Sequence, residues 1–358
     1  MTPDAPIAER LIFLFSLPRS GSTLLQTLLA RNPDIFSESE SRILMPPLLG
    51  YLDDDFELHH YYAAASYSEL RLLLDRTERH RATYFDAVRA YAGALYDARL
   101  RASGKRLFLD KTPGYTLVID EVVAAFPDAK IVFLLRNPIW VLASVIDAWH
   151  NGDPMKVLSA PMRMSIVLAQ PARLAESMRR LEGRSVIVRY EDFVTDPEAD
   201  LRRICDYLGV EFDDSMLTYS PAELTDDFAG DRKIRQHDRP VQTSLSLPPR
   251  LRSAVGARFA LRCLERIGPQ TYAALGYDYE ATRRELVAQK RPFPLSLFGD
   301  AVYALAWLKL LFWSIPRHQF GPRLKRDLQS FMRAWRGEAP PHYADTSSGE
   351  GGDDLAAK

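Results

Sequence analysis

Residues 11–31 read LIFLFSLPRSGSTLLQTLLAR, and this stretch decides the fold. Its first five residues are all apolar, which is typical of a strand buried on both faces of a sheet. A short polar loop, residues 16–23, comes next. Four leucines then recur at helical spacing: Leu24, Leu25, Leu28 and Leu29. The stretch therefore predicts a buried strand, a tight loop and a helix in direct succession.

The loop contains the parts of a phosphate-binding cradle. Backbone N–H groups converge at the start of a helix, where the helix dipole adds positive potential. Gly21 lets the backbone come close to a ligand. A planar cation and three hydroxyl donors stand beside it: Arg19, Ser20, Ser22 and Thr23. The alternative interpretation is a serine-rich turn with an arginine at the surface.

The loop is not a Walker A loop. That motif requires a second glycine and a lysine before the Ser or Thr, and both are missing here. A magnesium-dependent ATP or GTP site is therefore disfavoured.

The composition is that of an ordinary globular protein. The 358 residues are 47% hydrophobic and 26% charged, and the formal net charge is −1, so no basic field indicates a nucleic-acid partner. Two cysteines cannot form a metal site alone, and they suggest no disulfide framework, so we expect a reducing cytoplasm. We see no signal peptide and no run of 18 uncharged apolar residues, so no spanning helix is predicted.

Further strands are predicted at residues 106–110, 130–135 and 185–189, with helical patterns between them. Strands alternating with helices predict an α/β fold: a P-loop-like parallel sheet flanked by helices on both faces. Ligands bind at the carboxyl ends of strands in such sheets. Lys111, Arg136 and Tyr190 all follow predicted strands, so we expect them to join the cradle in one site.

Residues 18–25, PRSGSTLL, resemble the 5′-phosphosulfate loop of sulfotransferases that use 3′-phosphoadenosine 5′-phosphosulfate (PAPS). Arg136 and Ser144, eight residues apart, match the 3′-phosphate motif of that family. Tyr190 resembles the family tyrosine that contacts the nucleotide. The resemblance covers residues 11–209. It implies that residues 19–23, Arg136, Ser144 and Tyr190 bind PAPS, with 3′-phosphoadenosine 5′-phosphate (PAP) as product.

The resemblance also implies catalytic roles. Lys111 matches the family's catalytic lysine, and with Arg19 it is expected to stabilise the leaving PAP. Glu40, 21 residues after Arg19, matches the glutamate base of tyrosylprotein sulfotransferases, and Arg42 the substrate-binding arginine two residues on. The chain departs from that branch at Ser39, where the relatives have a second acid. Pro113 stands where cytosolic sulfotransferases have a histidine base, which excludes a histidine base there.

The expected function is sulfuryl transfer from PAPS to a hydroxyl or amine, without a metal ion. The acceptor could be a tyrosine, a sugar, a lipid or a small alcohol. Two alternatives stay open. A P-loop-type small-molecule kinase would need ATP and magnesium, and a non-catalytic PAP-binding module would keep the cradle but lose the base and the lysine.

The chain is expected to divide into an α/β domain at residues 1–290, a helical extension at 291–337 and a disordered tail at 338–358. Residues 295–326 are apolar and aromatic and then basic. They predict either a core helix pair or a segment that contacts the membrane peripherally, at its inner face. Arg232, Lys233 and Arg239 are read as a solvated charge run that could also close over the 3′-phosphate.

Overall fold

The computed structural model describes most of the first 289 residues. The described residues are 5–38, 40–51, 70, 73–74, 79–150, 152, 156–157, 161–220, 234, 238–240, 242, 246–252 and 254–289. The predicted extension at 291–337, the tail at 338–358 and the segment 295–326 lie outside this part of the chain, as do Arg232 and Lys233.

Five parallel strands form one sheet. They are β1 (Leu11–Ser16), β2 (Ile35–Ser37), β3 (Leu107–Asp110), β4 (Lys130–Leu135) and β5 (Ser185–Arg189). The order across the sheet is β2-β3-β1-β4-β5, so β1 lies at the centre. All six residues of β1 are buried, because helices cover both faces of the sheet at this central strand. The predicted parallel sheet is confirmed.

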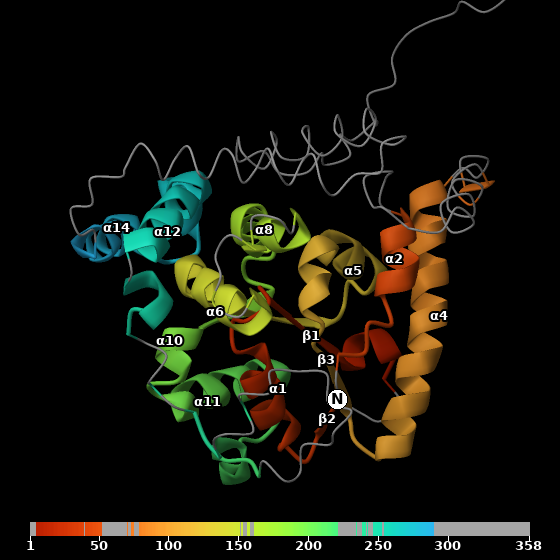
Figure 1. Ribbon diagram of the computed structural model, residues 1–358. Coiled ribbons are helices and arrows are strands. Elements are labelled where there is room, and N and C mark those ends of the chain that lie inside the picture. The colour runs from red at the N-terminus through yellow and green to blue at the C-terminus, as the bar shows by residue number, and fades with distance from the viewer. Residues whose placement is uncertain are drawn as a thin grey trace, which may run out of the picture.

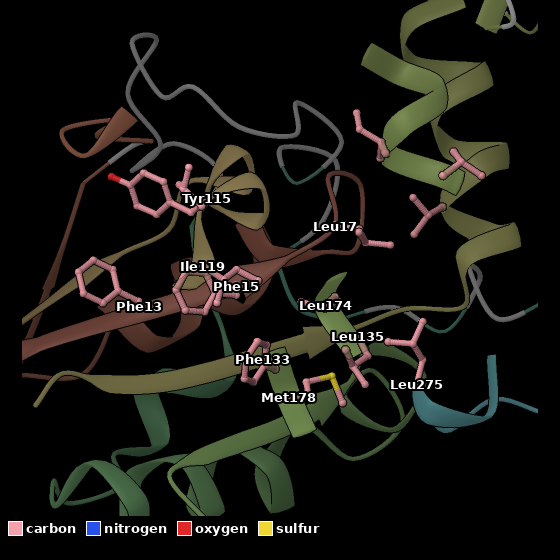
Figure 2. Close-up of a cluster of buried hydrophobic side chains, with 14 of the residues drawn as sticks. Phe13, Phe15, Leu17, Tyr115, Ile119, Phe133, Leu135, Leu174, Met178 and Leu275 are labelled. Atoms are coloured by element: carbon pink, nitrogen blue, oxygen red, sulfur yellow. The ribbon is translucent and has the colours of Figure 1, made fainter. Parts of the chain in front are cut away.

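The sheet separates two clusters of buried hydrophobic residues, one on each face. Phe13 and Phe15 of β1 face the larger cluster, whereas Ile12 and Leu14 face the smaller one, as the two-residue period of a strand requires. Figure 2 shows Phe13 and Phe15 in the larger cluster, packed beside Phe133, Tyr115 and Ile119. The ring centroids of Phe15 and Phe133, on neighbouring strands, are 5.7 Å apart.

Helices lie on both faces of the sheet, as predicted (Figure 1). The smaller cluster contains side chains of α1 (Ser22–Ala30), α10 (Tyr190–Phe193) and α11 (Pro197–Leu208). Most other helices contribute to the larger cluster. They are α2 (Met45–Tyr51), α4 (His80–Ser103), α5 (Ile119–Ala125), α6 (Pro138–His150), α8 (Pro161–Leu168), α9 (Gln170–Arg180), α12 (Ala254–Ile267), α13 (Pro269–Ala274) and α14 (Tyr279–Ala288).

Short 3₁₀ helices complete the described chain. They are η1 (Ile7–Arg10), η2 (Pro113–Leu117), η3 (Asp214–Leu217) and η7 (Pro249–Arg252). Within the described residues, no helix combines the length and apolar character needed to cross a membrane.

Candidate active site

The carboxyl ends of β1 and β4 organise the site. These two strands are neighbours, with Ser16 paired to Leu134. The chain leaves β1 toward α1 on one face and leaves β4 toward α6 on the other. Neighbouring loops that diverge in this way open a crevice, and open α/β sheets bind their ligands there. The cradle and Arg136 occupy these two loops.

Arg19 and Gly21 give the cradle its shape. Both have positive φ angles, 70° and 89°. A Cβ atom at position 21 would lie 2.4 Å from Cε2 of Tyr190, so only glycine fits beneath that ring. The sequence suggested that Gly21 makes room for a ligand, and in the structure it makes room for a side chain of the predicted site.

Four predicted residues meet at the carboxyl ends of these strands. The Arg136 guanidinium donates from Nη1 to the backbone oxygen of Arg19 at 2.9 Å. It also stacks on the Tyr190 ring, 4.5 Å from its centroid. Arg19 donates from Nε to Ser144 Oγ of α6 at 3.3 Å. The resemblance groups Ser144 with Arg136, whereas in the structure its hydroxyl contacts Arg19.

The cradle fits an anionic ligand. Ser22 and Thr23 are buried at the first turn of α1, where the helix dipole is positive. Ser20 Oγ and Arg136 Nε are buried, and neither has a hydrogen-bond partner among the described residues. Leaving a buried polar group unpaired costs about 1–3 kcal/mol, so a bound anion that accepts from these donors would be stabilised. Burial lowers the pKa of Arg136.

Glu40 and Lys111 form an ion pair between the ends of β2 and β3. Lys111 Nζ lies 3.2 Å from Glu40 Oε1, and Arg42 Nη2 lies 3.1 Å from Oε2 of the same carboxylate. The Lys111 side chain is fully buried, and burial lowers its pKa although Glu40 acts in the opposite direction. Arg42 is exposed and has a positive φ of 53°. The structure thus brings together the predicted base, the predicted lysine and the predicted substrate-binding arginine.

Asp110, at the end of β3, holds the loop that follows Glu40. Its carboxylate accepts hydrogen bonds from four hydroxyls, which belong to Ser41 (2.7 Å), Tyr96 (2.5 Å), Thr112 (3.3 Å) and Tyr115 (2.9 Å). The loop backbone is fixed as well, since Arg42 N donates to Thr112 Oγ1 at 3.2 Å. Burial raises the pKa of Asp110, and the four hydroxyls oppose this shift.

Sequence reasoning missed the acidic partners of the site. Asp110 and Glu191 each lie beside a predicted site residue, Lys111 or Tyr190. The rule that selected polar residues at strand ends would have found both, had it been applied to acids. Among the described residues, this site included, no three His, Cys, Asp or Glu side chains gather as a metal site would require.

Comparison with known proteins now identifies the family. The model of the sulfotransferase family matches residues 11–214, more than half of the 358 residues. The chain belongs to the sulfotransferase family. The matched segment includes the cradle, Glu40, Lys111, Arg136 and Tyr190, and it ends before α12.

Curated relatives are similar over part of their length. Nodulation protein NoeE of Sinorhizobium fredii is 29% identical over 261 residues, which cover 65% of this chain and 58% of NoeE. The protein-tyrosine sulfotransferase of Drosophila melanogaster is 25% identical over 208 residues, 58% of this chain and 39% of that protein. The chain therefore spans less than two thirds of the length of either relative.

Among solved structures, the sulfotransferase domain of the Synechococcus PCC 7002 olefin synthase is 26% identical, with a TM-score of 0.48. The match covers 75% of this chain and 94% of that domain. A mouse sulfotransferase solved in complex with PAP is 15% identical, with a TM-score of 0.35. That match covers 90% of this chain and 89% of the mouse chain.

Proposed function

We propose that this protein transfers a sulfuryl group from PAPS to a hydroxyl or amine acceptor. One observation carries the proposal. Adjacent strand ends in the order β2-β3-β1-β4-β5 carry Glu40, Lys111, the cradle, Arg136 and Tyr190. The Glu40–Lys111 ion pair, which could accept a proton and stabilise negative charge, therefore lies beside a site rich in hydrogen-bond donors for an anion. Membership of the sulfotransferase family supports the same reading.

The cradle and Arg136 would hold the two phosphorylated ends of the donor. Arg19, Ser20, Ser22 and Thr23 offer donors and positive charge for the 5′-phosphosulfate, with Gly21 shaping the loop. Arg136 provides a guanidinium fork for the 3′-phosphate, and Ser144 orients Arg19. Tyr190 packs against both Gly21 and Arg136, so it would contact the nucleotide from beside these two groups. When bound, PAPS supplies an activated sulfuryl group and leaves as PAP.

Glu40 would accept a proton, and Lys111 would stabilise developing negative charge. The Glu40 carboxylate accepts the proton of the acceptor hydroxyl, which makes the oxygen a better nucleophile. The buried Lys111 ammonium and Arg19 stabilise negative charge that develops on the leaving side. Arg42, exposed beside Glu40, is available to the acceptor. Each of these steps uses a side chain of the protein.

The acceptor class is open among hydroxyl-bearing molecules. Two relatives are named as protein-tyrosine sulfotransferases, and two others as sulfotransferases of a hydroxylated menaquinone. A first screen therefore pairs PAPS with tyrosine peptides, isoprenoid alcohols and sugar pools, and detects sulfated products by mass spectrometry.

The test of the donor is a thermal-shift titration of the full chain with PAP and, separately, with ATP and magnesium. We expect PAP to raise the melting temperature, because a ligand at 100 times its Kd stabilises the folded state by about 2.7 kcal/mol. Stabilisation by ATP and magnesium but not by PAP would replace the proposal with a kinase. Stabilisation by PAP without turnover of any acceptor would favour the non-catalytic binding module.

A further inference from the structure

Asn137 and Glu191 join the two segments that follow β4 and β5 and that carry Arg136 and Tyr190. Asn137 directly follows Arg136, and Glu191 directly follows Tyr190. The Asn137 backbone N–H donates to Glu191 Oε1 at 3.0 Å. A shift of either residue would therefore move both of the neighbouring side chains that we assign to the nucleotide.

Two buried tyrosines outside the matched family segment hold this joint. Tyr277, between α13 and α14, donates from its hydroxyl to Glu191 Oε2 at 2.8 Å. Tyr272, on α13, donates from its hydroxyl to Asn137 Oδ1. Both lie beyond residue 214, where the family match ends. Each tyrosine thus contacts one member of the Asn137–Glu191 pair.

A cation–π contact and an edge-to-face ring contact fix the same region. The Arg189 guanidinium lies 4.8 Å from the Tyr277 ring centroid, and the Tyr272 and Tyr277 rings lie 5.9 Å apart. Both tyrosines are buried, with exposed fractions of 0% and 7%. Burial, and next the Glu191 carboxylate, raise the pKa of Tyr277, so its hydroxyl stays protonated and remains a donor.

Arg136 needs this support more than an ordinary surface arginine does. Its guanidinium is held by one backbone oxygen and one aromatic face, and in the described chain it forms no ion pair within 4.0 Å. Negative charge on Glu191 favours the charged guanidinium against burial. Tyr277 orients Glu191 through its hydrogen bond. A change in the orientation of Glu191 would therefore change the position of the charged Arg136 guanidinium.

We propose that Tyr277 and Tyr272 are positioning residues for the 3′-phosphate half of the nucleotide site, acting through Glu191 and Asn137. This inference rests on the proposed donor. It gives the helices α12–α14 a role in ligand selection as well as in packing. A nucleotide that lacks the 3′-phosphate should not benefit from these tyrosines.

The experiment measures the 3′-phosphate selectivity, which is the Kd of adenosine 5′-monophosphate divided by the Kd of PAP. Calorimetry on the full chain compares wild type with Tyr277→Phe and Tyr272→Phe, below the melting temperature of every variant. Tyr207→Phe is the control, because its hydroxyl also joins separate segments of the chain. It does so through backbone groups near the start of β4, donating to Arg184 O at 2.7 Å and accepting from Ile131 N at 3.0 Å. We expect selectivity to fall about fivefold or more at positions 277 and 272, as for residues within one hydrogen-bond network, and to stay unchanged in the control.

Other outcomes separate the two proposals. If the variants melt at lower temperature but keep wild-type selectivity, the tyrosines only stabilise the fold and the inference is wrong. An equal loss of selectivity in the Tyr207 variant would likewise overturn it, because the effect would then be one of general stability. If wild type binds PAP no more tightly than adenosine 5′-monophosphate, the proposed donor itself fails, and this inference with it.

Discussion

Arg19 has a left-handed backbone conformation, which residues with a Cβ atom rarely adopt. Its φ is 70°, and the other non-glycine residue of the described chain with a positive φ is Arg42, at 53°. Both lie in the candidate site. Left-handed non-glycine residues persist where the surroundings over-determine them, and they concentrate at functional sites. At Arg19 the surroundings include the Arg136 contact to its backbone oxygen.

Substitution of Arg19 separates backbone strain from charge. Arg19→Gly and Arg19→Ala both remove the guanidinium, so both should lose PAP affinity. The glycine variant should be the more stable by about 1 kcal/mol, because an L-residue with a Cβ pays a steric cost in the left-handed region. Urea unfolding measures the stability difference and calorimetry the affinity. Equal stabilities would show that position 19 stores no strain.

Glu40→Gln tests the proton acceptor. The amide keeps the shape of the side chain but cannot take a proton, so turnover should fall about 10²–10⁴-fold. PAP binding should stay close to that of wild type, because Glu40 contacts Lys111 and Arg42 and not the cradle. Single-turnover rates with a sulfated-product readout provide the measurement. A rate within a few-fold of wild type would remove Glu40 from the mechanism.

Loss of charge on the buried Lys111 should set the alkaline limit of activity. Burial lowers its pKa from the ordinary value of 10.5, so it loses its charge at lower pH than an exposed lysine does. Because the charged form stabilises the leaving group, kcat should decline on the alkaline side below that ordinary value. Lys111→Arg keeps the charge at higher pH, so its profile should decline later, even at a lower maximum rate. Coincident alkaline limbs would assign the limit to another group.

Among the elements, the end of β3 depends on the buried Asp110 carboxylate. Burial raises its pKa above the ordinary 3.8, so in the range just above that value the folded protein binds more protons there than the unfolded chain. The free energy of unfolding that Asp110 contributes therefore falls as pH rises through its folded pKa.

Asp110→Asn removes this titration. As the pH rises above the ordinary carboxyl pKa of 3.8, the wild type should lose stability relative to the variant. Urea unfolding at several pH values gives both curves. A constant difference between them would mean that Asp110 has an ordinary pKa in the folded state.

The helix ends follow local sequence signals. Asn137 Oδ1 accepts from Ile139 N at 3.0 Å, and α6 begins at Pro138, as the N-cap and N1 preferences require. Asp196 caps α11, and Gly209 ends it in a left-handed conformation. These features depend on neighbours within a few residues, so the sequence contains the information directly.

Contacts between distant residues were beyond such signals. Lys111, Arg136 and Tyr190 could be selected because they follow predicted strands, and Glu40, Arg42 and Ser144 were selected by the family resemblance. The tyrosine contacts around them could not be predicted in either way. Tyr190 covers Gly21, and Tyr96 and Tyr115 donate to Asp110, through contacts that depend on how helices pack on the sheet. A buried tyrosine at helical spacing reads as ordinary core in a sequence, since the hydroxyl partner is not adjacent to it.

For the molecule as a whole, the nucleotide site depends on loops that are far apart in the chain. Arg19 and Arg136 are 117 residues apart and contact each other, and Tyr277 acts from a third region. Such a site exists only in the folded state, because the unfolded chain cannot bring these groups together. Nucleotide binding should therefore stabilise the whole fold, by mass action.

Alanine substitutions of Arg19 and Arg136 should affect nucleotide binding differently. The difference shows which arginine binds which phosphate. Arg136→Ala should bind PAP and adenosine 5′-monophosphate with similar affinity, because the 3′-phosphate loses its guanidinium. Arg19→Ala should weaken both nucleotides, because both carry the 5′-phosphate that the cradle holds. Removal of a charged hydrogen-bond partner costs about 2–5 kcal/mol where the pair is buried. Calorimetry with both nucleotides on both variants gives the four affinities. If Arg19→Ala alone abolished the preference for PAP, the 3′-phosphate would belong to the cradle and the site would have to be reversed.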